Sequence, residues 1–277
     1  MRHLKTHEEE ATAADSKRLF FGAQVQAPWP KEYPSARLIP EETRHLTLAF
    51  LGQNSVSKLA QALPSIPQPS FAIGPSGIAR ALIFLPLEKN RVVALSTDWL
   101  GDSAKLNSYQ KELLDWLQSL GYPLDKRPFF PHITLGRAPF DKKQWQEYFI
   151  PLPFFIKAIH LYQSLGQLRY ESLWESSLLS PFDEFEHTAD IAFLIRGHSI
   201  QELHRHAQLA LAFQFPLLIK FYTYQLQNSL EEIIISLNEI VAMADAEFGC
   251  PFKAVSFHGT IKSIEHNILL WEMIVDV

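Results

Sequence analysis

The chain has 277 residues, 47% of them hydrophobic and 20% charged, so it can bury sizeable cores and is not expected to be disordered. Its single cysteine, Cys250, excludes an internal disulfide framework and a multi-cysteine metal site. The formal net charge of −5 argues against a protein that coats nucleic acid electrostatically. The first residues lack the apolar stretch of a secretory signal, and no segment reaches the roughly 20 apolar residues of a membrane helix. We therefore expect a cytoplasmic protein with no membrane partner.

The charge is distributed unevenly along the chain. Residues 181–277 hold 5 Lys and Arg against 13 Asp and Glu, whereas residues 1–180 carry a small positive balance. The change coincides with the proline-containing stretch LLSPFDE at 178–184. A shift in charge at such a break indicates two units that face different partners. We expect a disordered N-terminal extension at 1–16, a first domain at 17–180 and a second domain at 182–277.

Apolar patterns in the first domain predict short strands and helices separated by proline-rich breaks. The expected strands are 18–28, 45–52, 81–87, 91–97, 131–138 and 154–164. The expected helices are 56–63, 103–120 and 142–148. Gly52 is expected to end the second strand, and the strands at 81–87 and 91–97 are expected to pair.

The second domain shows two long helical patterns between shorter apolar runs. The expected strands are 190–197, 252–259 and 266–277, and the expected helices are 199–213 and 229–248. Strands and helices mix without a strict β-α-β alternation in either domain. This predicts an α+β fold for both.

One motif occurs twice in the basic domain, as His45-Leu-Thr47-Leu and as His132-Ile-Thr134-Leu. Side chains alternate along a strand, so the histidine and threonine of each motif share one face, about 6.5 to 7 Å apart. The apolar residues between them face the opposite side and anchor the strand in a core. We treat a third His-x-Thr, at His258, as a chance occurrence.

If the two motif strands face one another across a cleft, their side chains suit in-line attack at phosphorus. One histidine can take a proton from the nucleophile while the other protonates the leaving oxygen, because an imidazole with a pKa near 6.5 populates both states near neutrality. Thr47 and Thr134 would hold the non-bridging oxygens, and Arg137 would stabilise their negative charge. This chemistry needs no metal, so no cofactor is expected for the first domain.

Four segments resemble, in order and spacing, the two-histidine phosphoesterases: RLFFGAQV, RHLTLAFLG, RPFFPHITLGRAP and LYQSLGQLRYESL. Over residues 17–180 the branch they look most like is the RNA 2′,3′-cyclic phosphodiesterases, also called 2′-5′ RNA ligases. The resemblance implies a bilobal pair of antiparallel-sheet lobes around a central cleft, and hydrolytic opening of a 2′,3′-cyclic phosphate to a 2′-phosphate. The matching residues are the catalytic His45 and His132, the phosphate-binding Thr47 and Thr134, and Arg137.

The acidic domain contains three aspartates of interest, Asp190, Asp245 and Asp276. Carboxylates are hard ligands suited to Mg²⁺, Ca²⁺ or Mn²⁺. On the residues alone, solvated caps or surface charges are the simpler interpretation. Lys253, at the start of an expected strand, is equally ambiguous.

EFEHTADIAFLIRG together with SIQELHRHAQLALA resembles the opening of archease, the small activator of the tRNA-splicing ligase of the RtcB type. The resemblance covers residues 182–277 and implies a smaller α+β domain. The chain is shorter than archease between the central helix and the lysine strand. The resemblance implies a ligase-activating set, Asp190, Lys253 and Asp276, and a divalent-cation set, Asp190, Asp245 and Asp276.

Together the two resemblances predict an RNA-end-processing hydrolase. Its partners would be RNA with 2′,3′-cyclic phosphate ends and an RNA ligase of the RtcB type. Two alternatives stay open. The chain could be a non-enzymatic adaptor or ligase cofactor that binds RNA ends, or a phosphodiesterase acting on small cyclic nucleotides. The first structural test is whether the imidazoles of His45 and His132 point into one shared cleft.

Overall fold

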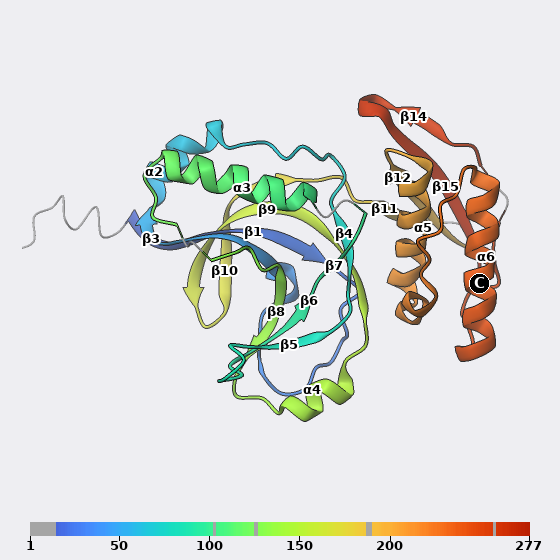
Figure 1. The fold of residues 1–277 in the computed structure, drawn as a ribbon, viewed down its shortest axis with the longest axis horizontal. Coiled ribbons are helices and arrows are strands. Elements are labelled where there is room, and N and C mark those ends of the chain that lie inside the picture. Colours follow the sequence, from blue (N-terminus) through green and yellow to red (C-terminus); the bar gives the residue numbers. More distant parts are fainter. Residues whose placement is uncertain (1–14, 102–103, 125–126, 187–189, 257–258) are drawn as a thin grey trace, which may run out of the picture.

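The computed structural model describes residues 15–101, 104–124, 127–186, 190–256 and 259–277. Within these residues the chain forms two antiparallel β-sheets with helices packed against each, which is the expected α+β architecture (Figure 1). None of the described helices is long and apolar enough to cross a bilayer.

The first sheet has ten strands, in the order β5-β6-β8-β3-β1-β9-β4-β7, with β2 paired to β8 and β10 paired to β9. In Figure 1 it is strongly curved, and α3 lies across its outer surface. The expected pair of lobes is therefore hydrogen-bonded into one sheet, in which β8 and β3 are neighbours. The strands are β1 (Ser16–Gln26), β2 (Arg37–Leu38), β3 (His45–Ser55), β4 (Ser76–Ala79), β5 (Leu82–Leu85), β6 (Val92–Ser96), β7 (Asp98–Leu100), β8 (His132–Arg137), β9 (Leu152–Gly166) and β10 (Arg169–Ser177). The helices are α2 (Val56–Ala62), α3 (Ala104–Ser119) and α4 (Lys142–Tyr148).

β1 is buried on both faces because each face contacts a different layer. Leu19, Phe21 and Ala23 belong to the main apolar core, together with the buried side chains of α3. The intervening residues, among them Phe20 and Gly22, face the opposite side of the sheet, toward β3 and β9 side chains. The helical spacing expected for 103–120 is confirmed over α3, and residue 103 lies outside the described residues.

Two expected boundaries of the first strands are wrong. β3 runs on to Ser55, because Gly52 does not end it but forms a bulge: pairing passes from Leu19–Gly52 to Phe20–Phe50, and Gly52 has a φ of +70°. β1 begins at Ser16, and the Asp15 carboxylate accepts a hydrogen bond from the Ser57 main-chain N–H at 3.1 Å. The rest of the expected extension, residues 1–14, lies outside the described residues.

The second sheet has five strands, in the order β11-β12-β15-β13, with β14 also paired to β15. Its two helices begin with Ser199 and Ser229, whose hydroxyls accept the main-chain N–H three residues later, as helix N-caps do. The strands are β11 (Phe182–Glu186), β12 (Ile191–Gly197), β13 (Ala254–Val255), β14 (Lys262–Ile264) and β15 (Ile268–Asp276). The helices are α5 (Ile200–Gln214) and α6 (Leu230–Phe248). The described residues also contain four 3₁₀ turns, at 41–43, 63–65, 216–221 and 265–267.

The strand expected at 252–259 is much shorter in the structure. Only Ala254 and Val255 pair with β15, opposite Asp276 and Val275. The preceding part of β15 instead pairs with β14, so the edge of β15 is divided between two short partners. Residues 257–258, which include His258, lie outside the described residues.

A second apolar core joins the two sheets. It contains Ile78 and Phe155 from the first sheet together with Phe182 and Phe213 from the second part of the chain. The Phe155 ring lies 5.8 Å from Phe182 and 5.4 Å from Phe213. The first sheet ends at Ser177 and the second begins at Phe182, and the division into domains at that point stays a prediction.

Candidate functional site

The two motif strands are neighbours in the first sheet. Leu46 of β3 pairs antiparallel with Ile133 of β8, and both side chains are fully buried on the core face. In that register His45 lies across from Thr134, and Thr47 lies across from His132. The structure thus brings all four motif side chains to one face of two adjacent strands, with the histidines on a diagonal.

Each histidine ring is oriented by a carbonyl two residues before it. His45 Nδ1 lies 2.6 Å from the Thr43 carbonyl oxygen, and His132 Nδ1 lies 2.8 Å from that of Phe130. A carbonyl oxygen only accepts, so Nδ1 carries the proton in both rings. Nε2 of a neutral ring then holds the lone pair, and it can take up or return a proton.

The two rings differ in burial. His45 is 8% exposed and contacts the rings of Phe20 at 4.8 Å, Tyr170 at 5.2 Å and Tyr162 at 5.4 Å. Burial lowers the pKa of His45 to about 4, against the hydrogen bond to Thr43, which raises it. Positive charge on His132 or His160 lowers this pKa further. His132 is half-buried, so water reaches it more easily.

Gly22 makes room for the His45 ring. A Cβ atom at this position of β1 would lie 3.1 Å from Cδ2 of His45 and 3.2 Å from the Tyr162 ring. Both contacts are tighter than ordinary van der Waals packing, so a larger residue would move the imidazole. The sequence analysis does not single out Gly22, because the residues across the sheet from it cannot be read from one segment of the chain.

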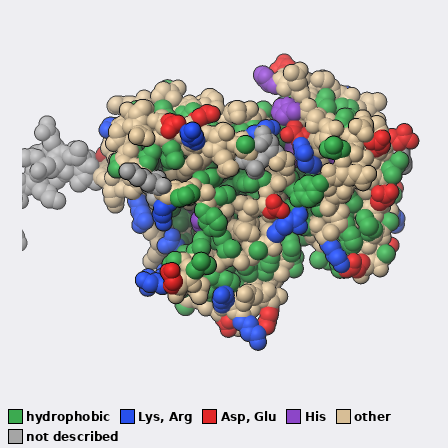
Figure 2. Space-filling model, viewed as in Figure 1, with side chains coloured by type: hydrophobic (Ala, Val, Ile, Leu, Met, Phe, Trp, Pro, Cys, Tyr) green, Lys and Arg blue, Asp and Glu red, His purple; other side chains and the backbone are tan. Residues whose placement is uncertain are grey.

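Positive charge lies close to the histidines. Arg137 is exposed at the end of β8, where it pairs with Arg37 of β2. Burial raises the pKa of Tyr170, whose ring contacts His45, and the positive charges of Arg137 and Arg18 oppose that rise. Figure 2 shows Lys and Arg side chains gathered over the first sheet, while Asp and Glu side chains are more frequent on the second part.

The structure separates the phenylalanines near the motifs into two groups. Phe129 and Phe140 pack against the main core, whereas Phe50 is 54% and Phe130 57% exposed. From the sequence alone, burial in the core is the expectation for all four of these apolar side chains, and it is wrong for Phe50 and Phe130. The Phe130 ring lies 5.5 Å from the His132 ring, so a flat apolar surface borders the site.

A third histidine, His160 of β9, was not singled out from the sequence. It is 4% exposed, and its ring stacks on Tyr162 at 4.8 Å, on the side chain that also contacts His45. Alternation along β9 places His160 and Tyr162 on one face, but only the pairing of β9 with β1 shows that this face is shared with the motifs.

The C-terminal candidates lie apart from these residues. Ile191 pairs with Val275, so Asp190 and Asp276 lie at the same end of β12 and β15. Lys253 is at that end too: its main-chain N–H donates to the Asp276 carbonyl at 2.8 Å, and its Nζ to the Val277 carbonyl at 2.5 Å.

Asp245 does not complete a cation site with these residues. Its carboxylate accepts the Cys250 main-chain N–H at 3.0 Å, beyond the end of α6, while the Asp276 carboxylate accepts the Ser256 hydroxyl at 3.1 Å. Over the described part of the chain, no group of three or more His, Cys, Asp or Glu side chains could hold a metal ion. In these described residues Asp190, Asp245 and Asp276 therefore do not come together as such a group.

Comparison with known proteins gives relatives for the first part of the chain. No protein-family model matches. An RNA 2′,3′-cyclic phosphodiesterase of Geobacillus stearothermophilus is 33% identical over 114 residues, which are 39% of this chain and 35% of that protein. The chain thus spans about a third of that relative. An RNA 2′,3′-cyclic phosphodiesterase of Thermotoga maritima is 24% identical over 163 residues, which are 52% of this chain and 82% of that protein.

Two solved structures are also similar. E. coli LigT complexed with 3′-AMP is 25% identical with a TM-score of 0.43, covering 59% of this chain and 98% of that one. The protein TT0787 of Thermus thermophilus is 22% identical with a TM-score of 0.44, also covering 59% and 98%. From the sequence matches, part of the chain is homologous to RNA 2′,3′-cyclic phosphodiesterases, which are hydrolases.

The environment of His45 predicts an unusually acidic imidazole. We expect its ring to stay neutral, with the proton on Nδ1, until the pH falls to about 4. In the unfolded chain the His45 ring takes up its second proton already near pH 6.5. As the pH falls from about 6.5 to about 4, this difference in pKa therefore lowers the free energy of unfolding progressively. Long-range ¹H–¹⁵N spectra of the imidazoles, assigned with His45→Gln, measure both tautomer and midpoint. A midpoint near 6.5, or a proton on Nε2, would contradict the geometry described above.

Proposed function

We propose that residues 17–180 act as an RNA 2′,3′-cyclic phosphodiesterase, with His45 and His132 as the pair that transfers protons. One observation carries the proposal: two imidazoles, each oriented by a main-chain carbonyl at Nδ1, share a face of two adjacent strands with two threonine hydroxyls. The homology to proteins with this activity supports it over part of the chain.

The reaction would proceed by in-line attack of water on the cyclic phosphate. Nε2 of one histidine takes a proton as the water oxygen bonds to phosphorus. The bond from phosphorus to the 3′ oxygen breaks, and Nε2 of the other, charged histidine donates a proton to that oxygen, leaving a 2′-phosphate. Each transfer contributes about 10²- to 10⁴-fold. Thr47, Thr134 and Arg137 would stabilise the charge on the non-bridging oxygens.

Burial favours His45 as the base. A general base must be neutral before the reaction, and the low pKa of His45 keeps its ring neutral at physiological pH. His132, which is half-buried beside exposed Phe130, would then be the acid at the leaving oxygen. The positive charges of Arg137 and its neighbour Arg37 would attract a phosphate that lies between the two imidazole rings.

Removing either imidazole should abolish turnover. We expect His45→Ala and His132→Ala each to lower kcat by about 10²- to 10⁴-fold on nucleoside 2′,3′-cyclic phosphates, because each deletes one proton transfer. Wild-type turnover should persist in EDTA and fall as the pH drops toward about 4, where His45 gains its charge. Binding of cyclic-phosphate RNA without turnover would instead favour the adaptor alternative.

A substrate whose 3′ bridging oxygen is replaced by sulfur tests the two roles within the same assay. A thiolate leaves without protonation, so this substrate should restore much of the activity of His132→Ala and little of that of His45→Ala. The opposite pattern would exchange the roles of the two histidines.

Phe130 is the residue on which we expect a nucleobase to stack. Stacking of a base on an aromatic ring contributes about 1–3 kcal/mol, so Phe130→Ala should raise KM for nucleoside cyclic phosphates by about 5- to 150-fold with kcat little changed. Phe130→Tyr should retain wild-type KM. A base-free ribose 2,3-cyclic phosphate is the control, because its KM should not respond. Equal effects on both substrates would contradict stacking, and equal turnover of mononucleotides and oligonucleotides would favour the small-nucleotide alternative.

For residues 182–277 we propose an archease-like role in activating an RNA ligase of the RtcB type. The support is the resemblance of EFEHTADIAF together with the convergence of Asp190, Lys253 and Asp276 at one end of the second sheet. No cation is part of this proposal, because Asp245 binds its own helix end.

Ligase activation can be measured separately from the phosphodiesterase. In a His45→Ala, His132→Ala background, which spares the cyclic phosphate, the protein should increase multiple-turnover joining of RNA ends by an RtcB-type ligase. Asp276→Asn and Lys253→Ala should abolish the increase, whereas Asp245→Asn, as the matched acidic control, should retain it. No increase with the intact second domain would refute the activator role.

A further inference from the structure

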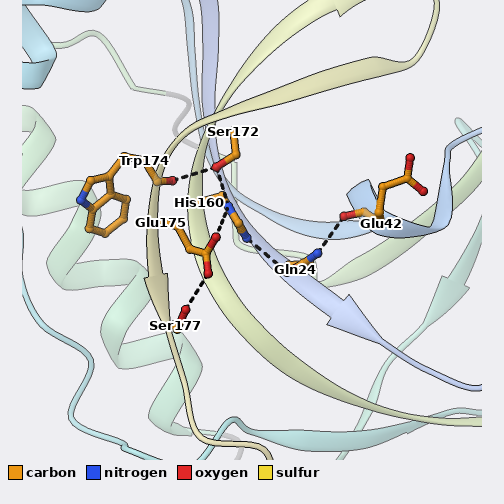
Figure 3. A network of polar contacts seen from close by, with 7 residues as sticks. All are labelled: Gln24, Glu42, His160, Ser172, Trp174, Glu175 and Ser177. Carbon is orange, nitrogen blue, oxygen red and sulfur yellow. Dashed lines mark hydrogen bonds and ion pairs between the residues drawn. The ribbon is translucent and has the colours of Figure 1, made fainter.

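A third buried imidazole, His160, lies behind the proposed catalytic pair and has a polar partner at each ring nitrogen. Its Nε2 is 3.2 Å from Gln24 Oε1, and its Nδ1 is 2.7 Å from the Ser172 hydroxyl (Figure 3). The ring is 4% exposed, so these partners replace water. Neither His-x-Thr motif includes His160, and the reaction proposed above does not use it.

The Gln24 amide determines where His160 carries its proton. Gln24 Nε2 donates to the Glu42 carbonyl at 2.7 Å, so its oxygen faces His160. An amide oxygen only accepts, and His160 must therefore donate from Nε2. This is the opposite ring nitrogen from His45 and His132, whose protons lie on Nδ1. Neutral His160 therefore has no free lone pair on Nε2, and it cannot act as a base through Nε2 as His45 and His132 can.

The other ring nitrogen connects His160 to β10. Ser172 lies 2.7 Å from Nδ1 and 3.2 Å from the Trp174 carbonyl, and Glu175 Oε2 lies 4.0 Å from Nδ1. His160 thus joins β9 and β10 on one side to β1 on the other. Figure 3 shows these contacts as one network that extends to Glu42.

The far end of this network is the turn that orients His45. Glu42 belongs to the 3₁₀ turn Glu41–Thr43, and the next residue, Thr43, supplies the carbonyl that accepts from His45 Nδ1. A second route is direct packing: Tyr162 lies between the two imidazoles, 4.8 Å from His160 and 5.4 Å from His45. Both routes end on the ring that must aim Nε2 at the substrate.

We propose that His160 is a positioning residue for His45, which it orients through Gln24 and the Glu41–Thr43 turn and through the shared ring of Tyr162. This inference rests on the proposed role of His45 in proton transfer. A displacement of a reacting group by about 1 Å can lower a rate by about 10²-fold, so the support of a single ring can decide turnover.

The charges around His160 are consistent with a neutral, structural ring. Burial lowers the pKa of His160, and Lys157 lowers it further, while Glu175 opposes both. His45, His132, Tyr162 and Tyr170 are further titratable groups near this face of the sheet, and burial raises the pKa of both tyrosines and keeps them neutral. A positive charge on His160 would also make His45 harder to protonate.

The test compares His160→Leu with His160→Gln. Leucine removes the donor to Gln24, so we expect kcat to fall about 10- to 100-fold with KM little changed. Glutamine can place an amide N–H near the position of Nε2 and should restore most of kcat. Gln24→Leu should reproduce the loss from the other side of the same hydrogen bond, and the double variant should be no worse than either single one. His204→Leu is the matched control, because His204 is 2% exposed but lies on α5 in the second domain.

Imidazole ¹H–¹⁵N spectra give a readout that does not depend on turnover. In His160→Leu and Gln24→Leu we expect the His45 ring to lose its preference for a proton on Nδ1, because its hydrogen bond to the Thr43 carbonyl is no longer held in place, with no such change in His204→Leu. An unchanged His45 spectrum with wild-type kcat in both variants would overturn the inference. If wild type itself shows no turnover, the proposed function fails, and the His45 spectra still decide whether His160 positions the ring. If His160→Leu does not fold, Gln24→Leu decides the question.

Discussion

The antiparallel register of β3 and β8 is the constraint on which the site depends. Leu46 and Ile133 meet on the core face, and this pairing leaves the histidines and threonines together on the other face. Since side chains alternate, a slip of one residue in either strand would move its histidine into the core and a leucine or isoleucine into the site. The apolar residues of the motifs therefore do more than anchor each strand, because they determine which polar groups meet across it.

Much of this arrangement follows from local pattern. Alternation along 45–52 and 131–138 predicts that each histidine shares a face with its threonine, and both strands are confirmed. Helical spacing predicts α3, α5 and α6 to within a residue or two. Their apolar faces, and the serine caps of α5 and α6, are local signals that a short stretch of sequence contains in full. The bulge at Gly52 escaped prediction, since a glycine signals a strand end and a bulge equally well.

The missing part of the site is non-local. Gly22, Tyr162 and His160 reach the motifs only because β1 lies between β3 and β9, and strand order cannot be read from any one segment. The exposure of a side chain also depends on contacts that are distant in sequence. Phe129 and Phe130 are neighbours in the chain, yet Phe129 packs against the core and Phe130 lies beside His132. The resemblance to archease implied a cation set of Asp190, Asp245 and Asp276, but the Asp245 carboxylate accepts a hydrogen bond from the Cys250 main-chain N–H, just beyond its own helix.

The apolar core between the two sheets has a consequence for how the protein can be divided. Phe155 lies on β9, the strand that also carries His160 and Tyr162, and its ring is covered by Phe182 and Phe213 from beyond residue 180. A cut between the two sheets would expose Phe155 to solvent. Phe155 lies on the same strand as His160 and Tyr162, which pack behind His45. The C-terminal part thus stabilises the position of β9 by packing against it. A fragment that ends at residue 180 would expose an aggregation-prone apolar surface, and its β9 would be more mobile.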